Sequence, residues 1–402
     1  MDTLKEAMRI ENEIIEIRRH LHENPEIGYE EFETSKLIKE YLKNEGIPYL
    51  EFAKTGVCGI IKGTKASTDK EKVLALRADI DGLPIQDAKK CSYASKKHGK
   101  MHGCGHDGHT SILLGAAKIL NKYKDEFNGI IKLIFEPAEE TTGGAKVMIE
   151  EGVLENPKVD AICGLHVDEA IVEGKIAVRY GTVNAASNPF TIKITGAGGH
   201  GAYPHNTVDP IVIASHVVIA LQSIVSREVD PLNPAVVTVG TISGGTAQNI
   251  IPGEVTISGI IRTMTLEDRA YVVRRLEEIV NGICISFRGK AMIKIEESYP
   301  CLYNNDHMVS ILRDSAKTVL GEENVSEQKN PKMGVESFAY FANKVPAVFY
   351  FLGVRNEEKG IIHPAHSNLF DIDERSLAKA VAIQCKFAID YLTRWEKNIN
   401  LV

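Results

Sequence analysis

Short apolar runs alternate with helical patterns through the first 185 residues of the chain, and this alternation constrains the fold more than any other feature. Residues 73–76, 130–135 and 161–165 are predominantly apolar runs typical of buried strands, whereas 111–120 and 145–151 have the periodicity of helices. Strands that alternate with helices predict an α/β fold, in which a mostly parallel sheet lies between helices on both faces.

The pattern changes near Asn184 and returns after Pro300. Between these points the predicted order is strand, helix, strand, strand, helix, strand, which is the split βαβ order of a ferredoxin-like α+β domain. These six elements are expected at 190–194, 210–225, 236–242, 255–261, 267–285 and 291–296. We therefore predict a discontinuous larger domain, 1–185 and 298–402, with an inserted domain at 186–297.

Composition excludes several classes of protein. Lys and Arg number 47 against 54 Asp and Glu, a net charge of −7, so no basic surface for nucleic acid is expected. No apolar run approaches the roughly 18 residues of a membrane helix, and the charged N-terminus does not resemble a secretory signal. Seven scattered cysteines argue against a disulfide framework and favour a reducing, cytoplasmic location. The classes of protein that these observations leave open are a soluble enzyme and a soluble binding protein.

The densest polar cluster lies at residues 102–109, where His102, Cys104, His106 and His109 fall within eight positions. Thiolate and imidazole groups are ligands for zinc and similar metals. Three interspersed glycines favour a loop, so His102 and His106 are not expected to form a helical metal-binding pair. The alternative is a loop of solvated histidines.

Three further polar clusters follow predicted strands. Asp79 and Asp81 follow the first strand, Glu139 and Glu140 the second, and His166 the third. In an open parallel sheet, ligands bind outside the carboxyl ends of the strands. Because burying carboxylates together is costly unless a cation offsets their charge, the four clusters together predict a metal site.

The adjacent acids Glu139 and Glu140 indicate two different chemical roles. One carboxylate can bind the metal while its neighbour removes a proton from a water that the metal has made more acidic. The alternative is a helix N-terminus that carries acids for electrostatic reasons.

Residues 196–201 match the pattern G-x-G-x-x-G of dinucleotide-binding proteins. That motif should open directly into a helix, but no helix is expected before Asp209, so the nucleotide interpretation fails. A glycine turn that presents His200 fits better, and residues 244–249 form a second such turn.

Motifs spread over nearly the whole chain resemble those of the M20 metallopeptidases, in particular the amidohydrolase branch with hippurate hydrolases, N-acyl-amino-acid deacylases and auxin-conjugate hydrolases. They are RRHLHENPE, LRADIDGLPI, MHGCGHDGHT, FEPAEE, GLHV, GGHGAYPHNTVDP, QNIIP and HSNLFDIDE. The resemblance implies two divalent ions (Zn, Mn, Co or Ni) and an inserted lid or dimerisation domain. The implied metal ligands are Cys104, His106, Glu140, His166 and His366.

The resemblance also implies the remaining roles. Glu139 is the implied general base, and Asp81 the carboxylate behind the metal site, while Asp79 stands where the wider family has a ligand histidine. His200 and Asn249 are implied to hold the oxygen of the scissile carbonyl. Arg262 is implied to bind a substrate carboxylate.

The expected function is metal-dependent hydrolysis of the amide bond of N-acyl amino acids, with a dipeptidase or carboxypeptidase of the same family as the main alternative. A Cys104 nucleophile activated by histidine is a second alternative, and a non-catalytic metal-binding or peptide-binding protein is a third. The expected partner is a small N-acyl amino acid or short peptide, with neither nucleic acid nor membrane. A free sheet edge in the lid domain favours pairing into a homodimer.

Overall fold

The computed structural model describes residues 1–67, 71–141 and 143–394. The chain divides into two compact units. The first comprises Met1–Val183, Tyr303–Asn330 and Tyr340–Val402, and the second comprises Asn184–Leu302 and Pro331–Ala339. The segment Pro331–Ala339 therefore groups with the second unit, whereas the sequence pattern assigned it to the larger domain.

The first unit is built on an eight-stranded sheet with the order β1-β2-β4-β3-β5-β16-β6-β15. The four neighbouring strands β4, β3, β5 and β16 are parallel, whereas β2 and β6 run antiparallel to them. At the two edges, β1 is antiparallel to β2 and β15 is parallel to β6. The strands are β1 (Tyr49–Phe52), β2 (Gly56–Lys62), β3 (Val73–Asp79), β4 (Ile130–Glu136), β5 (Ala161–Val172), β6 (Ile176–Val178), β15 (Val325–Glu327) and β16 (Ala347–Arg355). Strand β3 is buried along its whole length because helices cover both faces, which explains its apolar run.

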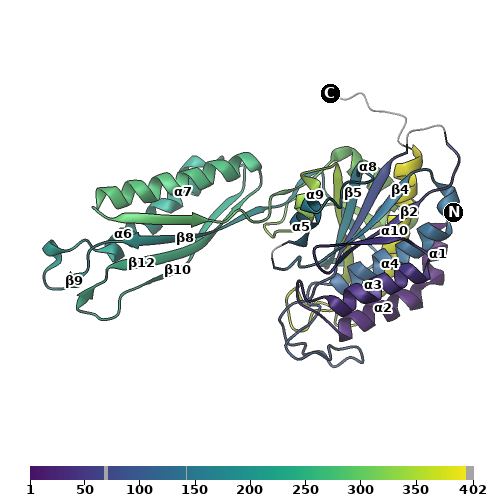
Figure 1. Ribbon diagram of the computed structural model, residues 1–402, viewed down its shortest axis with the longest axis horizontal. Helices are drawn as coiled ribbons and strands as arrows, with labels where there is room; N and C mark the ends of the chain where they lie inside the picture. Colours follow the sequence, from purple (N-terminus) through teal and green to yellow (C-terminus); the bar gives the residue numbers. More distant parts are fainter. Residues whose placement is uncertain (68–70, 142, 395–402) are drawn as a thin grey trace. The chain divides into compact units, whose positions relative to one another are not determined.

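The helices of this unit pack on the two faces of the sheet. Figure 1 shows α4 and α10 on one side of the strands and α5 and α9 on the other. The helices are α1 (Thr3–Arg9), α2 (Glu11–Glu23), α3 (Phe32–Asn44), α4 (His106–Lys122), α5 (Gly144–Glu150), α8 (Asp306–Leu320) and α10 (Arg375–Arg394), together with α9 (Phe338–Ala342), which spans the boundary between the two units. The predicted α/β fold with a mostly parallel central sheet is confirmed.

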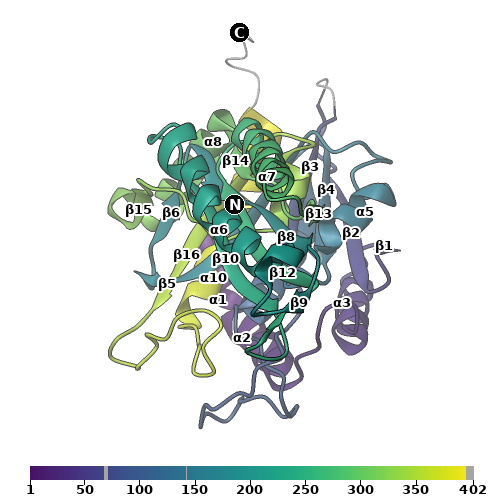
Figure 2. The same cartoon turned by 90° about the vertical axis from the view of Figure 1, so that its left-hand side faces the viewer.

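The second unit contains a four-stranded antiparallel sheet with the order β10-β12-β8-β13. Its helices α6 (Pro210–Ser223) and α7 (Leu266–Ser286) lie on the same face of this sheet (Figures 1 and 2). The strands are β8 (Ala186–Thr195), β10 (Ala235–Gly244), β12 (Glu254–Thr263) and β13 (Lys290–Ile295). This chain order and strand order are those of the predicted split βαβ arrangement. Two small pairs, β9 (Gly199–His200) with β11 (Ile250–Ile251) and β7 (Gly181–Asn184) with β14 (Leu302–Asn304), complete the strands.

Helix α6 begins where its capping residues predict. Asp209 accepts hydrogen bonds from two backbone N–H groups of the first turn, and Pro210 occupies the first helical position. Among the described residues, one helical stretch, Pro210–Glu228, has the length and apolar composition of a membrane span, with a mean hydropathy of 1.5. The expectation that no segment approaches that length is therefore wrong, although one face of this helix packs on the sheet through Ile213, Val217 and Leu221.

Two boundaries near the polar clusters differ from prediction. The glycine-rich loop ends at Gly105, so His106 is the first residue of α4 rather than part of a loop. Strand β5 continues through His166 to Val172, so this histidine lies within the strand and not after it. The loop that carries Glu139 and Glu140 precedes α5, which begins only at Gly144. These acids therefore do not lie at the N-terminus of a helix.

Candidate metal centre

The polar clusters meet at the carboxyl end of β3, in the middle of the parallel strands. The chain leaves β3 through α4 to β4 on one side and later returns to β5 on the other side. Such a reversal opens a crevice at the strand ends, where open α/β sheets bind ligands. Asp79 ends β3, and its partner in the parallel register is Glu136 at the end of β4.

Cys104 and His106 reach this crevice because Gly105 turns the chain between them. Gly105 has φ +93°, a left-handed conformation that glycine adopts without strain. A Cβ atom at this position would lie 2.4 Å from Cγ2 of Val167 on β5. Any larger residue would push the N-terminus of α4 away from the strand that carries His166.

Asp81 fixes the orientation of the His106 ring. Nδ1 of His106 lies 3.1 Å from Oδ1 of Asp81, which leaves Nε2 pointing toward Asp79 and Glu140 at 3.7 and 3.9 Å. Among the described residues no hydrogen-bond partner reaches this buried Nε2 atom. A histidine held through one nitrogen by a carboxylate, with the other nitrogen free, is the usual arrangement of a metal ligand.

His166 and Cys104 form the second side of the cluster. Nδ1 of His166 lies 2.6 Å from the carbonyl oxygen of Val167, so Nε2 faces Sγ of Cys104 at 3.3 Å. Burial, with Glu140 nearby, raises the pKa of the Cys104 thiol well above its usual value. A buried thiolate here therefore requires a cation next to it.

His366 and Glu140 complete the cluster. Nε2 of His366 lies 3.2 Å from Oε1 of Glu140. The backbone N–H of His366 donates to the carbonyl oxygen of Gly103, which ties the two loops together. His366 has φ +66°, an uncommon conformation for a non-glycine residue that is often found at functional sites.

The donor atoms fit a pair of divalent cations. They form overlapping groups whose atoms lie within 4.8 Å of one another: Cys104–His106–His166, Cys104–Glu140–His366, and His106–Glu139–Glu140. Thiolate, imidazole and carboxylate together are the ligand set of zinc and its neighbours in the periodic table. The geometry thus brings together all five ligands expected from the sequence, together with Glu139 and Asp81.

His109 lies beside this cluster but has no nitrogen left for a metal. Its Nδ1 is 2.6 Å from Oδ1 of Asp79, and its Nε2 accepts a hydrogen bond of 2.9 Å from the backbone N–H of Val167. Burial lowers the pKa of His109 to about 4, so the ring is neutral near pH 7. His109 therefore holds β3, α4 and β5 in register.

The sequence patterns did not reveal the network of charged side chains around Asp79. Arg77 is fully buried and binds Asp79 at 2.8 Å and Glu136 at 2.6 Å. A cation within an otherwise apolar strand, two positions before an acid, was the signal that could have revealed this network. Asp79 is therefore shared between Arg77 and His109, in addition to facing His106.

The remaining predicted site residues belong to the second unit. His200 on β9 and Asn249 are exposed, and the hydrogen bond from the Gly201 N–H to the carbonyl oxygen of Asn249 joins their glycine turns. Arg262 lies apart on β12, where its buried Nη1 atom has no hydrogen-bond partner among the described residues. This unit thus brings His200 and Asn249 together and leaves Arg262 with unused donor capacity.

The model of peptidase family M20/M25/M40 matches residues 75–390. The chain belongs to this family. Its resemblance to the M20 metallopeptidases is thereby confirmed, and the match spans all of the metal-centre residues named above.

Individual M20 relatives cover almost the whole chain. IAA-amino acid hydrolase ILR1-like 2 of Arabidopsis thaliana is 43% identical over 384 residues, which are 94% of this chain and 85% of the relative. Thermostable carboxypeptidase 2 of Saccharolobus solfataricus is 39% identical over 96% of this chain and 97% of its own. Among solved structures, the YXEP protein of Bacillus subtilis, a dinuclear metal binding peptidase from the M20 family, superimposes with a TM-score of 0.82 at 31% identity and covers 96% and 99% of the two chains.

We predict that His109→Leu destabilises the protein even when metal is absent. The substitution leaves Oδ1 of Asp79 and the N–H of Val167 buried without partners, and each buried polar group left unsatisfied costs about 1–3 kcal/mol, more when it is charged. Urea unfolding in the presence of a chelator measures the loss. Thr110→Val is the matched control, since it removes one hydrogen bond to the Asp79 carbonyl at an expected cost of about 1 kcal/mol. Equal effects of the two variants would contradict the role given to His109.

Proposed function

We propose that this M20 protein is a metal-dependent amidohydrolase that cleaves the amide bond of N-acyl amino acids. The observation that carries the proposal is the cluster of five ligand side chains with Glu139 beside them at the carboxyl end of β3. Two divalent cations, of Zn, Mn, Co or Ni, would be held by Cys104, His106, Glu140, His166 and His366. The relative named as an IAA-amino acid hydrolase supports this substrate class.

Glu139 supplies the acid–base chemistry. When bound, the cations would polarise the amide carbonyl and make a nearby water more acidic. Glu139 takes a proton from that water as its oxygen adds to the carbonyl carbon, and it passes the proton to the nitrogen as the C–N bond breaks. Asp81 contributes by holding His106 in the tautomer that presents Nε2.

The inserted domain, residues 186–297, acts as a lid that provides contacts to the substrate. In this proposal His200 and Asn249 donate hydrogen bonds to the carbonyl oxygen as negative charge develops on it. Arg262 binds the carboxylate of the amino-acid part. The buried Nη1 of Arg262, which has no hydrogen-bond partner among the described residues, supports a role in binding an anion.

A carboxypeptidase or dipeptidase remains the second candidate, because the relative named as a thermostable carboxypeptidase is 39% identical over nearly the full length. Hydrolysis of a peptide bond uses the same groups in the same roles. The two remaining alternatives are a Cys104 nucleophile and a non-catalytic binding protein. Neither explains why Glu139 lies beside all five ligand side chains.

A substrate panel run with each metal separates these functions. The chelated enzyme is assayed on N-acetyl amino acids, N-benzoyl amino acids and dipeptides after addition of Zn, Mn, Co or Ni. We expect no turnover without metal and, with metal, the highest kcat/KM on an N-acyl amino acid. Faster cleavage of dipeptides would favour the peptidase. Full activity of the metal-free protein that a thiol alkylator abolishes would favour the Cys104 nucleophile.

Glu139→Gln and Glu140→Gln form a matched pair that separates base from ligand. Glu139→Gln should retain two metal ions per chain yet lose about 10²-fold or more in kcat, the usual contribution of a general base. Glu140→Gln should lose metal as well as activity. Metal content is measured by plasma mass spectrometry, and depletion in Glu139→Gln but not in Glu140→Gln would reverse the two assignments.

His200→Ala tests the role of the lid. We expect the variant to fold and to retain its metal, but to lose about 10²–10³-fold in kcat, as when one donor to a developing oxyanion is removed. The inhibition constant of an unreactive substrate analogue should change far less, because the donor acts mainly in the transition state. His205→Ala, in the same exposed segment, is the control. A near-normal kcat for His200→Ala would reject the lid mechanism.

We propose that two copies of the chain pair through the second unit. Helix α6 exposes Ile211, Val212 and Ile219, and β10 is an edge strand of the four-stranded sheet in the described part of the chain. Ile219→Lys should shift the mass measured by light scattering from dimer to monomer, whereas Met292→Lys, on an exposed residue of the opposite edge strand, should leave it unchanged. A dimer that persists in Ile219→Lys would place the contact elsewhere.

We also propose a cytoplasmic location. All seven cysteines lie in the described part of the chain, and none of them forms a disulfide there. Cysteines outside disulfides, most of them buried, suit a reducing compartment.

A further inference from the structure

The loop that carries Glu139 is held from both sides by carboxylates. The backbone N–H of Glu140 donates to Oδ2 of Asp81 at 3.0 Å. The backbone N–H of Ala138 donates to Oε1 of Glu31 at 2.8 Å. The two amides that flank Glu139 are therefore each fixed by a buried acid, one near the end of β3 and the other just before α3.

Ala138 needs such support because its backbone conformation is unfavourable. Its φ of +56° lies in the left-handed region, which costs a non-glycine residue free energy and persists only where the surroundings enforce it. The Ala138 carbonyl accepts a hydrogen bond from the Gly143 N–H, and a Cβ atom on Gly28 would lie 2.9 Å from Cβ of Ala138. Because Ala138 directly precedes Glu139, its conformation decides the direction in which the Glu139 side chain leaves the loop.

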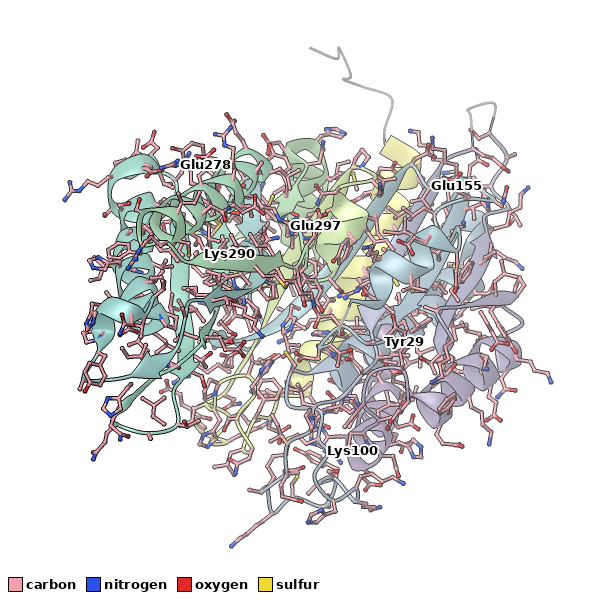
Figure 3. All side chains as sticks on the ribbon, turned by 60° about the vertical axis from the view of Figure 1, so that its left-hand side comes forward. Tyr29, Lys100, Glu155, Glu278, Lys290 and Glu297 are labelled. Atoms are coloured by element: carbon pink, nitrogen blue, oxygen red, sulfur yellow. The ribbon has the colours of Figure 1, made fainter. Side chains whose placement is uncertain are left out.

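Burial of the Glu31 carboxyl group costs free energy, so packing alone does not explain an acid at this position. Glu31 has no exposed surface, and burial raises the pKa of its carboxyl to about 7. Its second oxygen, Oε2, accepts a hydrogen bond of 2.7 Å from the hydroxyl of Thr55 on the neighbouring chain segment. Tyr29, which Figure 3 labels, lies two residues before Glu31 in the chain.

We propose that Glu31 is a positioning residue for hydrolysis: through the Ala138 amide it holds the Glu139 carboxylate in the direction that proton transfer requires. This role rests on the proposed function of Glu139 as the base. Proton transfer depends steeply on geometry, and a displacement of about 1 Å can cost about 10²-fold in rate. Glu31 does not contact the substrate or the metal ligands in this account.

Three variants, with Glu31→Asp as a substitute for the first, separate positioning from packing alone. Glu31→Ala removes the acceptor for Ala138 and should lower kcat by about 10²-fold, with KM and metal content unchanged. Glu31→Gln should recover most of this loss, since its amide oxygen can still accept from the Ala138 N–H while its amide nitrogen donates to Thr55. Thr55→Val leaves the Ala138 contact intact and should keep nearly normal kcat. If Glu31→Ala does not fold, Glu31→Asp, which shortens the reach by one methylene, should show the same loss of kcat at unchanged metal content.

A double-mutant cycle with Glu139→Gln gives the decisive result. If Glu31 acts through Glu139, the loss caused by Glu31→Ala or Glu31→Asp should fall to less than about two-fold in the Glu139→Gln background, because coupled residues are not additive. An undiminished loss in that background, a loss of metal, or a normal kcat in the single Glu31 variants would each overturn the positioning role. If Glu139→Gln itself keeps normal kcat, the proposed function fails first, and the two failures are thereby distinguished.

Discussion

The structure of the first unit depends on how negative charge is held at the carboxyl end of β3. Asp79, Asp81, Glu139 and Glu140 converge there, together with the thiol of Cys104. Carboxylates removed from water repel one another and lose hydration, so a site of this kind is stable only when cations or directed hydrogen-bond donors compensate. Arg77 compensates Asp79 and Glu136. The remaining charge is the physical reason to place divalent metal ions in the cluster.

Much of the surrounding fold serves to bring donors to these acids. Backbone N–H groups of Ala138 and Glu140 point at Glu31 and Asp81, and the imidazole of His109 links Asp79 to Val167. The parallel register makes this convergence efficient, because neighbouring parallel strands end side by side and each contributes a short loop at the same edge. A change of register between β3 and β5 would separate the Asp79–His109 pair from the strand that carries His166.

The sequence predicted this architecture where periodicity and position along the chain carried the signal. Predominantly apolar runs identified β3, β4 and β5, and the polar clusters that follow two of these strands drew attention to Asp79, Asp81, Glu139 and Glu140. Side-chain chemistry drew attention to the cluster at residues 102–109, and the resemblance to the M20 metallopeptidases then selected Cys104, His106, His166 and His366 as ligands. The start of α4 at His106 was missed, since three glycines in the segment argue against a helix, whereas the left-handed Gly105 in fact ends the loop.

Glu31 could not be predicted, because its role depends on a contact with Ala138 across more than a hundred residues. The assignment of residues 331–339 depends on packing and has no counterpart in the local pattern.

Anomalous X-ray diffraction from crystals grown with Zn or Mn, measured on both sides of the absorption edge of the metal, tests the central claim most directly. We expect two anomalous peaks in each chain. For zinc, the peaks should lie about 2.0–2.3 Å from ligand atoms of Cys104, His106, Glu140, His166 and His366. Asp79 and His109 should remain bound to each other. The absence of peaks in this cluster, or a peak bound by the ring of His109, would contradict the proposed two-metal site.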